Sequence, residues 1–381
     1  MYLIDRSLDK SFVSLIKDPD KYYEFRDGVV TEHDFPLSVT LFFSGVTKLM
    51  QEIFNRLISV LTLSFSPAVC LSFSVDPYLL VKLLFVCRKE RIGVLQSEFH
   101  VTVPTSVVAK KILNIPLIYD AHNVEAEIIR DIDNIRPVYV SATRLVEKTG
   151  CLMCDLVFAV SERDKEEFVS WGIPENKIEV IPNSVDFNQY SSQTMRENIR
   201  AKYGLTGKTV LIFHGPLGYP PNKEAALLLS QKILPSISKV GSDVSLLLVG
   251  KNPPKISNLN VITTGFVEQL ADYIAAADIA VVPLLKGGGT RIKIVEYMAS
   301  GKAIVSTLKG AEGLNLENGI DAFLTKDAGS EFVNRVLELI EDNTLRIKLG
   351  ANAQKKAEFL YDWSKTASRA AVIYDRLIGE S

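Results

Sequence analysis

From about residue 92 onward, short apolar runs alternate with stretches that carry apolar residues at helical spacing. An uninterrupted apolar run is typical of a strand buried on both faces, and this alternation is typical of β-α-β units around a parallel sheet. The pattern therefore predicts an α/β protein. The expected strands are residues 94–95, 116–119, 156–160, 177–181, 209–214, 244–249, 261–262, 279–282, 303–306 and 322–324.

Amphipathic stretches between these strands predict the helices. A short polar helix should begin at Ser161, directly after the strand 156–160, because the serine hydroxyl can cap a helix with Asp164 three residues on. This places Ser161 at the carboxyl edge of the sheet. The other expected helices are residues 222–233, 271–277, 292–299, 331–341, 345–359 and 364–378.

The length of the chain predicts two domains. At 381 residues it exceeds the size that one hydrophobic core usually serves. Residues 183–205 are polar and rich in charge, and they separate two runs of α/β pattern, so they are the expected linker. No fixed-period repeat of the solenoid type is present.

The charge balance and the cysteines exclude several kinds of site. The chain holds 43 basic and 45 acidic residues without a long run of one sign, so binding to nucleic acid is not expected. Two cysteines form a Cys-Leu-Met-Cys pair, without a second pair or a histidine cluster at zinc spacing. Cys70, Cys87, Cys151 and Cys154 are therefore expected to be buried thiols in a reducing compartment, and no metal site is expected.

The first residues do not resemble a secretory signal, so a cytoplasmic location is expected. Residues 57–75 carry no charge over 19 residues, which is near the length that spans a bilayer. Five serines, one threonine and Pro67 interrupt this segment, and a second apolar run at 79–86 is broken by Lys82, so core strands and helices are favoured. The alternative that stays open is peripheral contact with the inner face of the cell membrane.

Residues 283–296 carry the clearest chemical signal. They read Pro-Leu-Leu-Lys-Gly-Gly-Gly-Thr-Arg-Ile-Lys-Ile-Val-Glu and run from a buried strand through three glycines into a helix. Glycines permit a tight turn and close approach of a ligand, and a helix N-terminus attracts an anion. Arg291 and Lys293 add positive charge, and Glu296 can accept hydrogen bonds from ribose hydroxyls. The segment predicts a nucleoside diphosphate site, and the alternative is a plain strand-to-helix turn with solvated charges.

Two common nucleotide motifs do not fit this segment. The dinucleotide fingerprint is not met, and no Gly-Lys-Ser or Gly-Lys-Thr follows the glycines as in a phosphate-binding loop. Hydride transfer and ATP hydrolysis are therefore disfavoured.

Several segments, in the same order along the chain, resemble the glycosyltransferase 4 family. In the second half, residues 264–268, 273–283, 287–307 and 310–313 are similar to the donor domain of that family. In the first half, the corresponding segments are Tyr-Asp-Ala-His-Asn-Val-Glu, Val-Ser-Glu and Val-Ile-Pro-Asn-Ser-Val-Asp, at residues 119–125, 160–162 and 180–186. The resemblance covers about residues 90 to 380.

The resemblance implies the GT-B architecture, in which two Rossmann-like domains face each other across a cleft. Residues 1–186 would form the acceptor-side domain and residues 187–362 the nucleotide-sugar-binding domain, and the last helix, within 363–381, would cross back onto the first domain. The resemblance also implies retention at the anomeric carbon without a metal or other cofactor. Positive side chains and helix dipoles would neutralise the leaving diphosphate.

The family resemblance also assigns roles to residues. It places Glu296 on the ribose and the backbone near Phe266 and Val267 beside the base. His122 matches a cleft histidine that contacts the donor sugar near the reacting centre, which makes it the candidate catalytic residue. The expected donor-binding residues are Gly287, Gly288, Gly289, Thr290, Arg291, Lys293, Glu296, Phe266 and Val267.

The donor site departs from the family pattern at two places. Gly288 stands where members commonly carry the first of two glutamates, so the amides of the glycine turn are expected to hold the donor sugar instead. Pro216 stands where an arginine is expected, and no lysine precedes Asn222 in the same loop. Arg291 and Lys293 are therefore expected to supply the diphosphate contacts.

The first domain is expected to lack its first strand and helix, because residues 1–5 resemble the second strand of a family member. The leading hypothesis is transfer of a hexosyl unit from a nucleotide sugar to a saccharide or lipid-linked acceptor, in glycan or cell-surface polysaccharide biosynthesis. The early part of the chain keeps a second hypothesis open, a catalytically inactive binding or scaffold subunit. A third, a nucleotide-sugar epimerase, would need carboxylates for proton abstraction, for which Glu125 and Glu162 are candidates.

Overall fold

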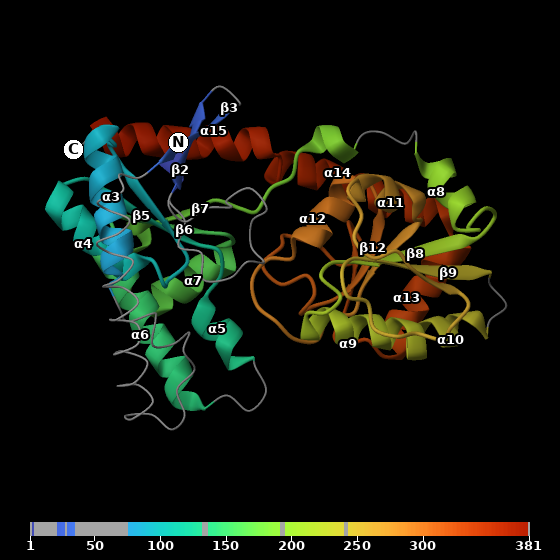
Figure 1. Cartoon of the computed structure of the whole chain (residues 1–381). Coiled ribbons are helices and arrows are strands. Elements are labelled where there is room, and N and C mark those ends of the chain that lie inside the picture. The colour runs from blue at the N-terminus through green and yellow to red at the C-terminus, as the bar shows by residue number, and fades with distance from the viewer. Residues whose placement is uncertain are drawn as a thin grey trace.

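The structure of the protein is a computed structural model, which describes residues 2–3, 21–26, 29–34, 75–131, 136–190, 195–239 and 243–379. Figure 1 shows two α/β lobes side by side, with blue-to-green segments in the first lobe and yellow-to-orange segments in the second. The red carboxyl-terminal helix reaches back across the first lobe.

The first lobe is built on a parallel sheet of four strands in the order β4-β5-β6-β7. Its central strands β5 and β6 are almost entirely buried, which is why they read as continuous apolar runs. The strands are β4 (Leu95–Glu98), β5 (Leu117–Ala121), β6 (Leu156–Ala159) and β7 (Ile178–Val180). The helices are α3 (Pro77–Lys89), α4 (Val103–Leu113), α5 (Glu125–Arg130), α6 (Pro137–Met153), α7 (Glu162–Ser170) and the short η1 (Glu175–Lys177).

The second lobe is built on a parallel sheet of six strands in the order β10-β9-β8-β11-β12-β13. The chain runs outward from β8 to β9 and β10 on one side, and from β11 to β12 and β13 on the other. The loops after β8 and β11 therefore diverge, and a crevice is expected between them at the carboxyl edge. The strands are β8 (Thr209–His214), β9 (Val244–Val249), β10 (Val261–Thr263), β11 (Ile279–Val282), β12 (Ala303–Thr307) and β13 (Phe323–Thr325).

Helices of the second lobe cover this sheet and bury its apolar side chains in a single core. They are α8 (Arg196–Lys202), α9 (Pro220–Leu228), η3 (Leu229–Ile233), α10 (Leu234–Ser238), α11 (Leu270–Ala276), α12 (Ile292–Ala299), α13 (Ser330–Glu341) and α14 (Asn343–Leu360).

Two segments join the lobes. The chain enters the second lobe through the short helix η2 (Phe187–Tyr190) and returns through α15 (Trp363–Gly379). Ile373 of α15 packs in one buried cluster with Ile118, Leu156 and Phe158 of the first sheet. The last helix therefore rests on the first lobe, as Figure 1 also shows. The expected domain boundaries at residues 186 and 362 stay predictions.

A separate antiparallel sheet contains the first described residues. It consists of β1 (Tyr2–Leu3), β2 (Lys21–Arg26) and β3 (Val29–Asp34), in that order. The sequence predicts that residues 1–5 form the second strand of the first Rossmann-like sheet. In the described part of the chain, β1 instead pairs antiparallel with β2 and does not join the parallel sheet.

The periodicity predicts most element bounds closely. The strands β8, β9 and β11 and the helix α12 match the prediction to the residue. The helix expected at 222–233 begins earlier, at Pro220, and continues without a break to Ser238. A proline is favourable in the first turn of a helix, where its missing N–H is not needed. The expected cap is confirmed, because Ser161 Oγ accepts from the backbone N–H of Asp164.

The expected linker 183–205 is wrong in its second part. Ile199 and Leu205 are buried in the core of the second lobe. The charges that suggested a solvated linker are paired, because Arg196 and Arg200 donate to the two carboxylate oxygens of Asp278 at 2.8 and 2.6 Å. The sequence could not reveal this, since the acidic partner lies about eighty residues away.

Three of the cysteines are confirmed as buried free thiols, Cys87, Cys151 and Cys154. Burial raises the pKa of Cys87 to about 11, so this thiol is unreactive at neutral pH. Cys70 and nearly all of the apolar segment 57–75 lie outside the described residues. In the part of the chain that is described, no helix has the length and apolar character needed to cross a membrane.

Candidate functional site

The glycine turn, residues 287–289, lies between β11 and α12 at the carboxyl edge of the second sheet. Gly287 and Gly289 have φ of 102° and 70°, which favours glycine at both positions. The Arg291 side chain folds back, and its Nη1 donates to the carbonyl oxygens of Gly288 and Gly289. Its Nη2 is buried without a hydrogen-bond acceptor among the described residues. A buried, unsatisfied cationic donor beside a glycine turn is suited to an anionic ligand.

Lys293 lies on the first turn of α12 and is buried. Its Nζ donates to Asn222 Oδ1 at 2.7 Å and lies 4.2 Å from the centre of the Phe213 ring. Burial lowers the pKa of Lys293 to about 7. A Cβ atom at Gly215 would lie 3.2 Å from this Nζ, so the glycine keeps space beside the ammonium group. Pro216, at the position of the expected arginine, contributes only its carbonyl, which accepts from Asn222 Nδ2.

Glu296 lies one turn further along α12 and is held on both sides. Tyr190 donates its hydroxyl to Glu296 Oε1 at 3.1 Å. His214 places Nε2 3.1 Å from Glu296 Oε2. The carboxylate therefore lies beside the end of β8, with a donor at Oε1 and the His214 ring next to Oε2.

Phe266 and Val267 follow β10, near the carboxyl edge of the same sheet. Phe266 is 66% exposed, and Lys251 Nζ lies 4.6 Å from the centre of its ring. Val267 packs partly against the core. The two adjoining loops are joined because the Gly250 backbone N–H donates to Gly265 O. An exposed aromatic ring on a loop at this edge can stack against a planar base.

The first lobe packs directly onto the glycine turn. A Cβ atom at Gly288 would lie 2.4 Å from Ile128 Cγ1 of α5, and one at Gly289 would lie 1.7 Å from Asn123 Oδ1. Any side chain at either position would collide with the first lobe. The sequence interpretation assigned these glycines to the donor, whereas here they also make room for the contact between the lobes.

Polar side chains near the carboxyl edges of the two sheets also meet. Asn183, after β7, donates from Nδ2 to Thr290 Oγ1 at 2.7 Å. A Cβ atom at Gly313 would lie 2.9 Å from Thr290 Cγ2 and 3.2 Å from Ser161 Oγ. The predicted donor residue Thr290 therefore faces the first lobe.

A network of charges connects the lobes beside these contacts. Arg163 Nη2 lies 2.8 Å from Glu127 of its own lobe and 3.2 Å from Glu312 of the second lobe. Lys309 of the second lobe lies 3.0 Å from Asp131 and 2.8 Å from Glu312. The two basic residues, one from each lobe, thus share Glu312 and hold the lobes together in this arrangement.

His122 follows β5, where the ring stacks on Phe99 with centroids 4.4 Å apart. Its Nε2 lies 3.8 Å from Glu98 Oε2. Asp120 completes a group whose ligand atoms lie within 4.8 Å of one another, and Gln96 Nε2 donates to Asp120 Oδ2. Burial raises the pKa of Asp120 to about 6. These three side chains are of the kinds that can ligate a divalent cation, a possibility that the sequence did not indicate.

The carboxylates proposed for an epimerase lie in different surroundings. Glu125 is half-buried, and burial raises its pKa. Glu162 is exposed at the start of α7. These surroundings do not mark Glu125 and Glu162 as a pair of carboxylates that abstracts a substrate proton.

Sequence reasoning missed the residues that position the predicted ones. These are Asn222 for Lys293, His214 and Tyr190 for Glu296, and Asn123 and Ile128 for the glycine turn. The position of His214 at the end of a predicted strand was a usable signal, since strand ends of a parallel sheet line its ligand crevice. Asn123 lies within the segment 119–125 that resembles the family, which was also a usable signal. The other three carried none, because nothing near them in the sequence marks their partner.

Two family profiles match the chain. The profile described as "Glycosyltransferase Family 4" matches residues 38–189, and the one described as "Glycosyl transferases group 1" matches residues 208–342. An uncharacterised glycosyltransferase of Methanocaldococcus jannaschii is 27% identical over 236 residues, which are 59% of each chain. A phosphatidyl-myo-inositol mannosyltransferase of Mycolicibacterium smegmatis is 27% identical over 209 residues, 52% of each chain. The chain thus spans between half and three fifths of the length of these relatives.

Solved structures share the fold at low sequence identity. The Anabaena protein HepE in complex with UDP superposes with a TM-score of 0.65 at 21% identity, covering 79% of this chain and 82% of that one. The sucrose-phosphate synthase of Thermosynechococcus elongatus has a TM-score of 0.66 at 17% identity, covering 84% and 82%. The similarity confirms the expected α/β architecture of two lobes with parallel sheets.

Proposed function

Because this chain belongs to glycosyltransferase family 4, we propose that it transfers a hexosyl unit from a nucleotide sugar to a saccharide or lipid-linked acceptor, with retention at the anomeric carbon. The observation that carries the proposal is the arrangement on α12. Lys293 and Glu296 lie one turn apart at the point where the strand order reverses, one suited to a diphosphate and the other to a ribose.

The diphosphate would lie over the glycine turn. Lys293 Nζ has open space beside Gly215, and Arg291 Nη2 is a buried donor with no acceptor among the described residues. Fixed cationic donors in a site without water stabilise the negative charge that develops on a leaving group. These two side chains would thus replace the arginine and lysine that the loop after β8 lacks.

Two variants separate the proposed phosphate contact of Arg291 from its hydrogen bonds to the glycine turn. Arg291→Ala removes both the bonds to the turn carbonyls and the charge, whereas Arg291→Lys keeps the charge and loses the forked geometry. If the guanidinium binds phosphate, alanine should weaken nucleotide binding by about a hundredfold and lysine by clearly less. A loss of no more than a few-fold in the alanine variant would refute the phosphate contact.

The base would stack near Phe266, whose exposed ring lies under Lys251. The solved HepE structures contain UDP or UDP-glucose, so UDP-sugars are the first donors to test, followed by GDP- and ADP-sugars. Stabilisation in a thermal-shift screen by one donor, lost in Glu296→Ala, together with slow release of the nucleoside diphosphate, would support the proposal. No response to any donor would overturn it.

His122 would face the transferred sugar from the first lobe. Its stacking on Phe99 fixes the ring plane, so the ring can contact the reacting sugar without reorganising. His122→Ala should lower kcat by about a hundredfold while donor affinity changes little. Equal losses of kcat/KM and donor affinity would instead indicate a role in binding alone.

The proposed reaction uses no metal. The group Glu98, Asp120 and His122 makes this assumption testable, because it offers a place for a cation. Transfer that persists in EDTA would support metal-independent chemistry. Loss of activity in EDTA that is restored by a divalent cation would refute it.

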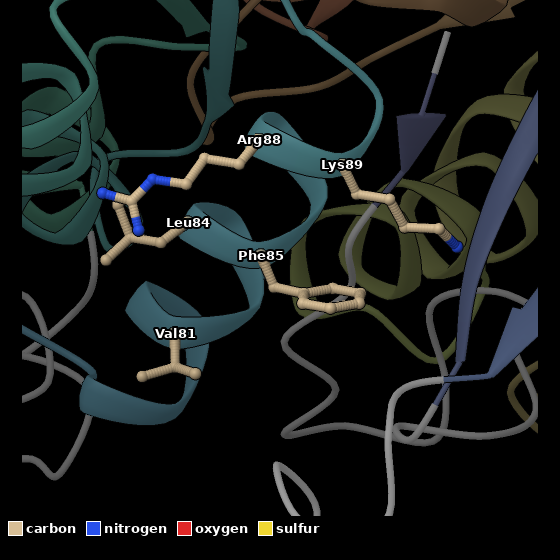
Figure 2. Close-up of a pocket in the computed structure, with 5 residues that line it drawn as sticks. All are labelled: Val81, Leu84, Phe85, Arg88 and Lys89. Atoms are coloured by element: carbon tan, nitrogen blue, oxygen red, sulfur yellow. The ribbon is translucent and has the colours of Figure 1, made fainter.

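We also propose that the first lobe contacts a membrane surface near α3. Figure 2 shows Val81, Leu84 and Phe85 on α3, with Arg88 and Lys89 on the last turn of the same helix. These five side chains line a hollow of about 520 Å³. An apolar surface edged by basic side chains suits a bilayer with anionic lipids. Flotation with such vesicles should carry the protein upward, and charge reversal at Arg88 should reduce it. Absence of binding by the wild type would refute this part of the proposal.

A further inference from the structure

We propose that Tyr190 and His214 are positioning residues that fix the Glu296 carboxylate in the orientation in which it receives the donor ribose. The inference rests on the proposed function, because it takes a nucleotide as the ligand of this site. It adds two residues to the donor site, one of them from the segment that links the lobes.

Each oxygen of the Glu296 carboxylate has one polar neighbour. Tyr190 donates to Oε1 at 3.1 Å, and His214 Nε2 lies 3.1 Å from Oε2. The Glu296 side chain is only 14% exposed and that of His214 only 7%. A hydrogen bond to one oxygen and a ring nitrogen close to the other, from different elements, restrict the plane of the carboxylate as well as its position.

Both partners are themselves held in place. The His214 backbone N–H donates to the Tyr297 hydroxyl, and the two rings meet edge to face with centroids 5.0 Å apart. Tyr190 lies on η2, which packs against α11 and α12. Neither side chain therefore has to reorganise when a ligand arrives.

The protonation states fit donation to Glu296. Burial raises the pKa of Tyr190, and the charge of Glu296 raises it further, so the phenol keeps its proton. Burial lowers the pKa of His214, so the imidazole is neutral near pH 7. A carboxylate oxygen can only accept, so His214 can donate to Glu296 only as the tautomer with its proton on Nε2, and in this structure Nε2 lies 3.1 Å from Oε2 without a hydrogen bond in good geometry.

The carboxylate keeps capacity for a ligand. Each carboxylate oxygen can accept two hydrogen bonds; Tyr190 uses one on Oε1, and His214 Nε2 occupies one side of Oε2. The two remaining positions match the two neighbouring hydroxyls of a ribose, which a rotating carboxylate would bind less well. The chemistry thus requires a ligand with a vicinal diol, and the ribose of a nucleotide supplies one.

The test compares a nucleotide with its dideoxy form. Isothermal titration would measure the affinity of UDP and of 2′,3′-dideoxy-UDP, with GDP and 2′,3′-dideoxy-GDP in parallel. Tyr190→Phe should weaken the ribonucleotide about three- to tenfold and leave the dideoxy form within about twofold. Tyr273→Phe, at a tyrosine of the same lobe whose ring packs against Tyr203, is the matched control and should change neither.

His214 is tested with two variants, because it is buried. His214→Leu removes the ring nitrogen beside Oε2 and should show the same ribose-dependent loss, whereas His214→Gln keeps an N–H group near the position of Nε2 and should restore much of it. Thermal unfolding of each variant would exclude a general loss of structure. If His214→Leu does not fold, Tyr190→Phe alone decides the question.

The outcomes distinguish a failure of this inference from a failure of the proposed function. If Glu296→Gln loses the preference for ribose but Tyr190→Phe keeps it in full, this inference is overturned and the donor site stands. If Glu296→Gln itself keeps the preference, the assignment of Glu296 to the ribose is overturned and this inference with it. If neither UDP nor GDP binds the wild type, the proposed function is overturned first.

Discussion

Lys293→Met removes a buried ammonium group while keeping an unbranched side chain, and we predict that it abolishes the proton uptake that accompanies nucleotide binding. Burial lowers the pKa of Lys293 from the usual 10.5 to about 7. A diphosphate beside Nζ would favour the charged form and raise the pKa again. Binding should therefore draw a proton from solution wherever the free site is neutral.

The same pKa makes the stability of the free protein depend on pH. Between pH 7 and 10.5 the unfolded chain holds the lysine proton and the folded chain does not, so the free energy of unfolding rises with pH across this window. Across this window the free energy of unfolding rises by roughly 5 kcal/mol, and this gain is fully lost below about pH 7. Lys293→Met should lack this slope, so the stability difference between wild type and variant should change with pH in urea unfolding.

The proton uptake can be measured by calorimetry. At about pH 8 some nine tenths of a group with a pKa near 7 are neutral, so binding should take up close to one proton per nucleotide. UDP itself is fully ionised there. The enthalpy of binding in HEPES and in Tris differs by the proton number times the difference between the two buffer ionisation enthalpies. Lys293→Met should give almost no difference between the buffers.

Lys302→Met is the matched control. Lys302 is a second buried lysine of this lobe, and burial lowers its pKa to about 8, but it bonds to Ala275 O and Ala277 O at the other edge of the sheet. Its replacement should leave the uptake unchanged. If wild type and Lys293→Met take up the same number of protons on nucleotide binding, the reasoning is refuted, because the proton then does not go to Lys293.

Two further predictions concern the contact between the two lobes, and a third concerns the core of the second lobe. Lys309→Glu places like charges opposite Asp131 and should open the lobes, seen as a larger radius of gyration in small-angle X-ray scattering, and adding Asp131→Lys should close them again. Gly288→Ala would put a Cβ atom 2.4 Å from Ile128 Cγ1 and should also open the lobes, with Ile128→Ala restoring the contact. Asp278→Asn breaks a buried ion pair, because this carboxylate binds two arginines and the Val210 backbone N–H, and should cost about 3 kcal/mol in urea unfolding.

Each of these predictions has an outcome that contradicts it. If the double variant Lys309→Glu/Asp131→Lys has as large a radius of gyration as Lys309→Glu alone, the two residues do not interact in solution. Gly288→Ala with unchanged dimensions would show that Ile128 does not rest on the turn. A loss below about 1 kcal/mol in Asp278→Asn would indicate that the arginines find other partners.

The strands and the chemistry of the turn follow from local sequence. The strands β8, β9 and β11 are buried along almost their whole length, so each reads as an unbroken apolar run whose ends mark the ends of the strand. The glycine turn and the charges after it are neighbours in the chain, so one stretch of sequence predicts both a tight backbone turn and an anion site. Local signals of this kind need no knowledge of what packs against them.

What the tertiary structure decided is which polar groups meet. Lys293 pairs with Asn222 71 residues away, and Glu296 with Tyr190 106 residues away. Arg196 and Arg200 looked like linker charges until Asp278 was placed between them. The periodicity of a sequence reports which face of an element is apolar, but a buried charge is stable only beside a partner that the packing of distant elements brings to it. Gly288 follows the same rule, because the side chain that requires a glycine there, Ile128, belongs to the other lobe.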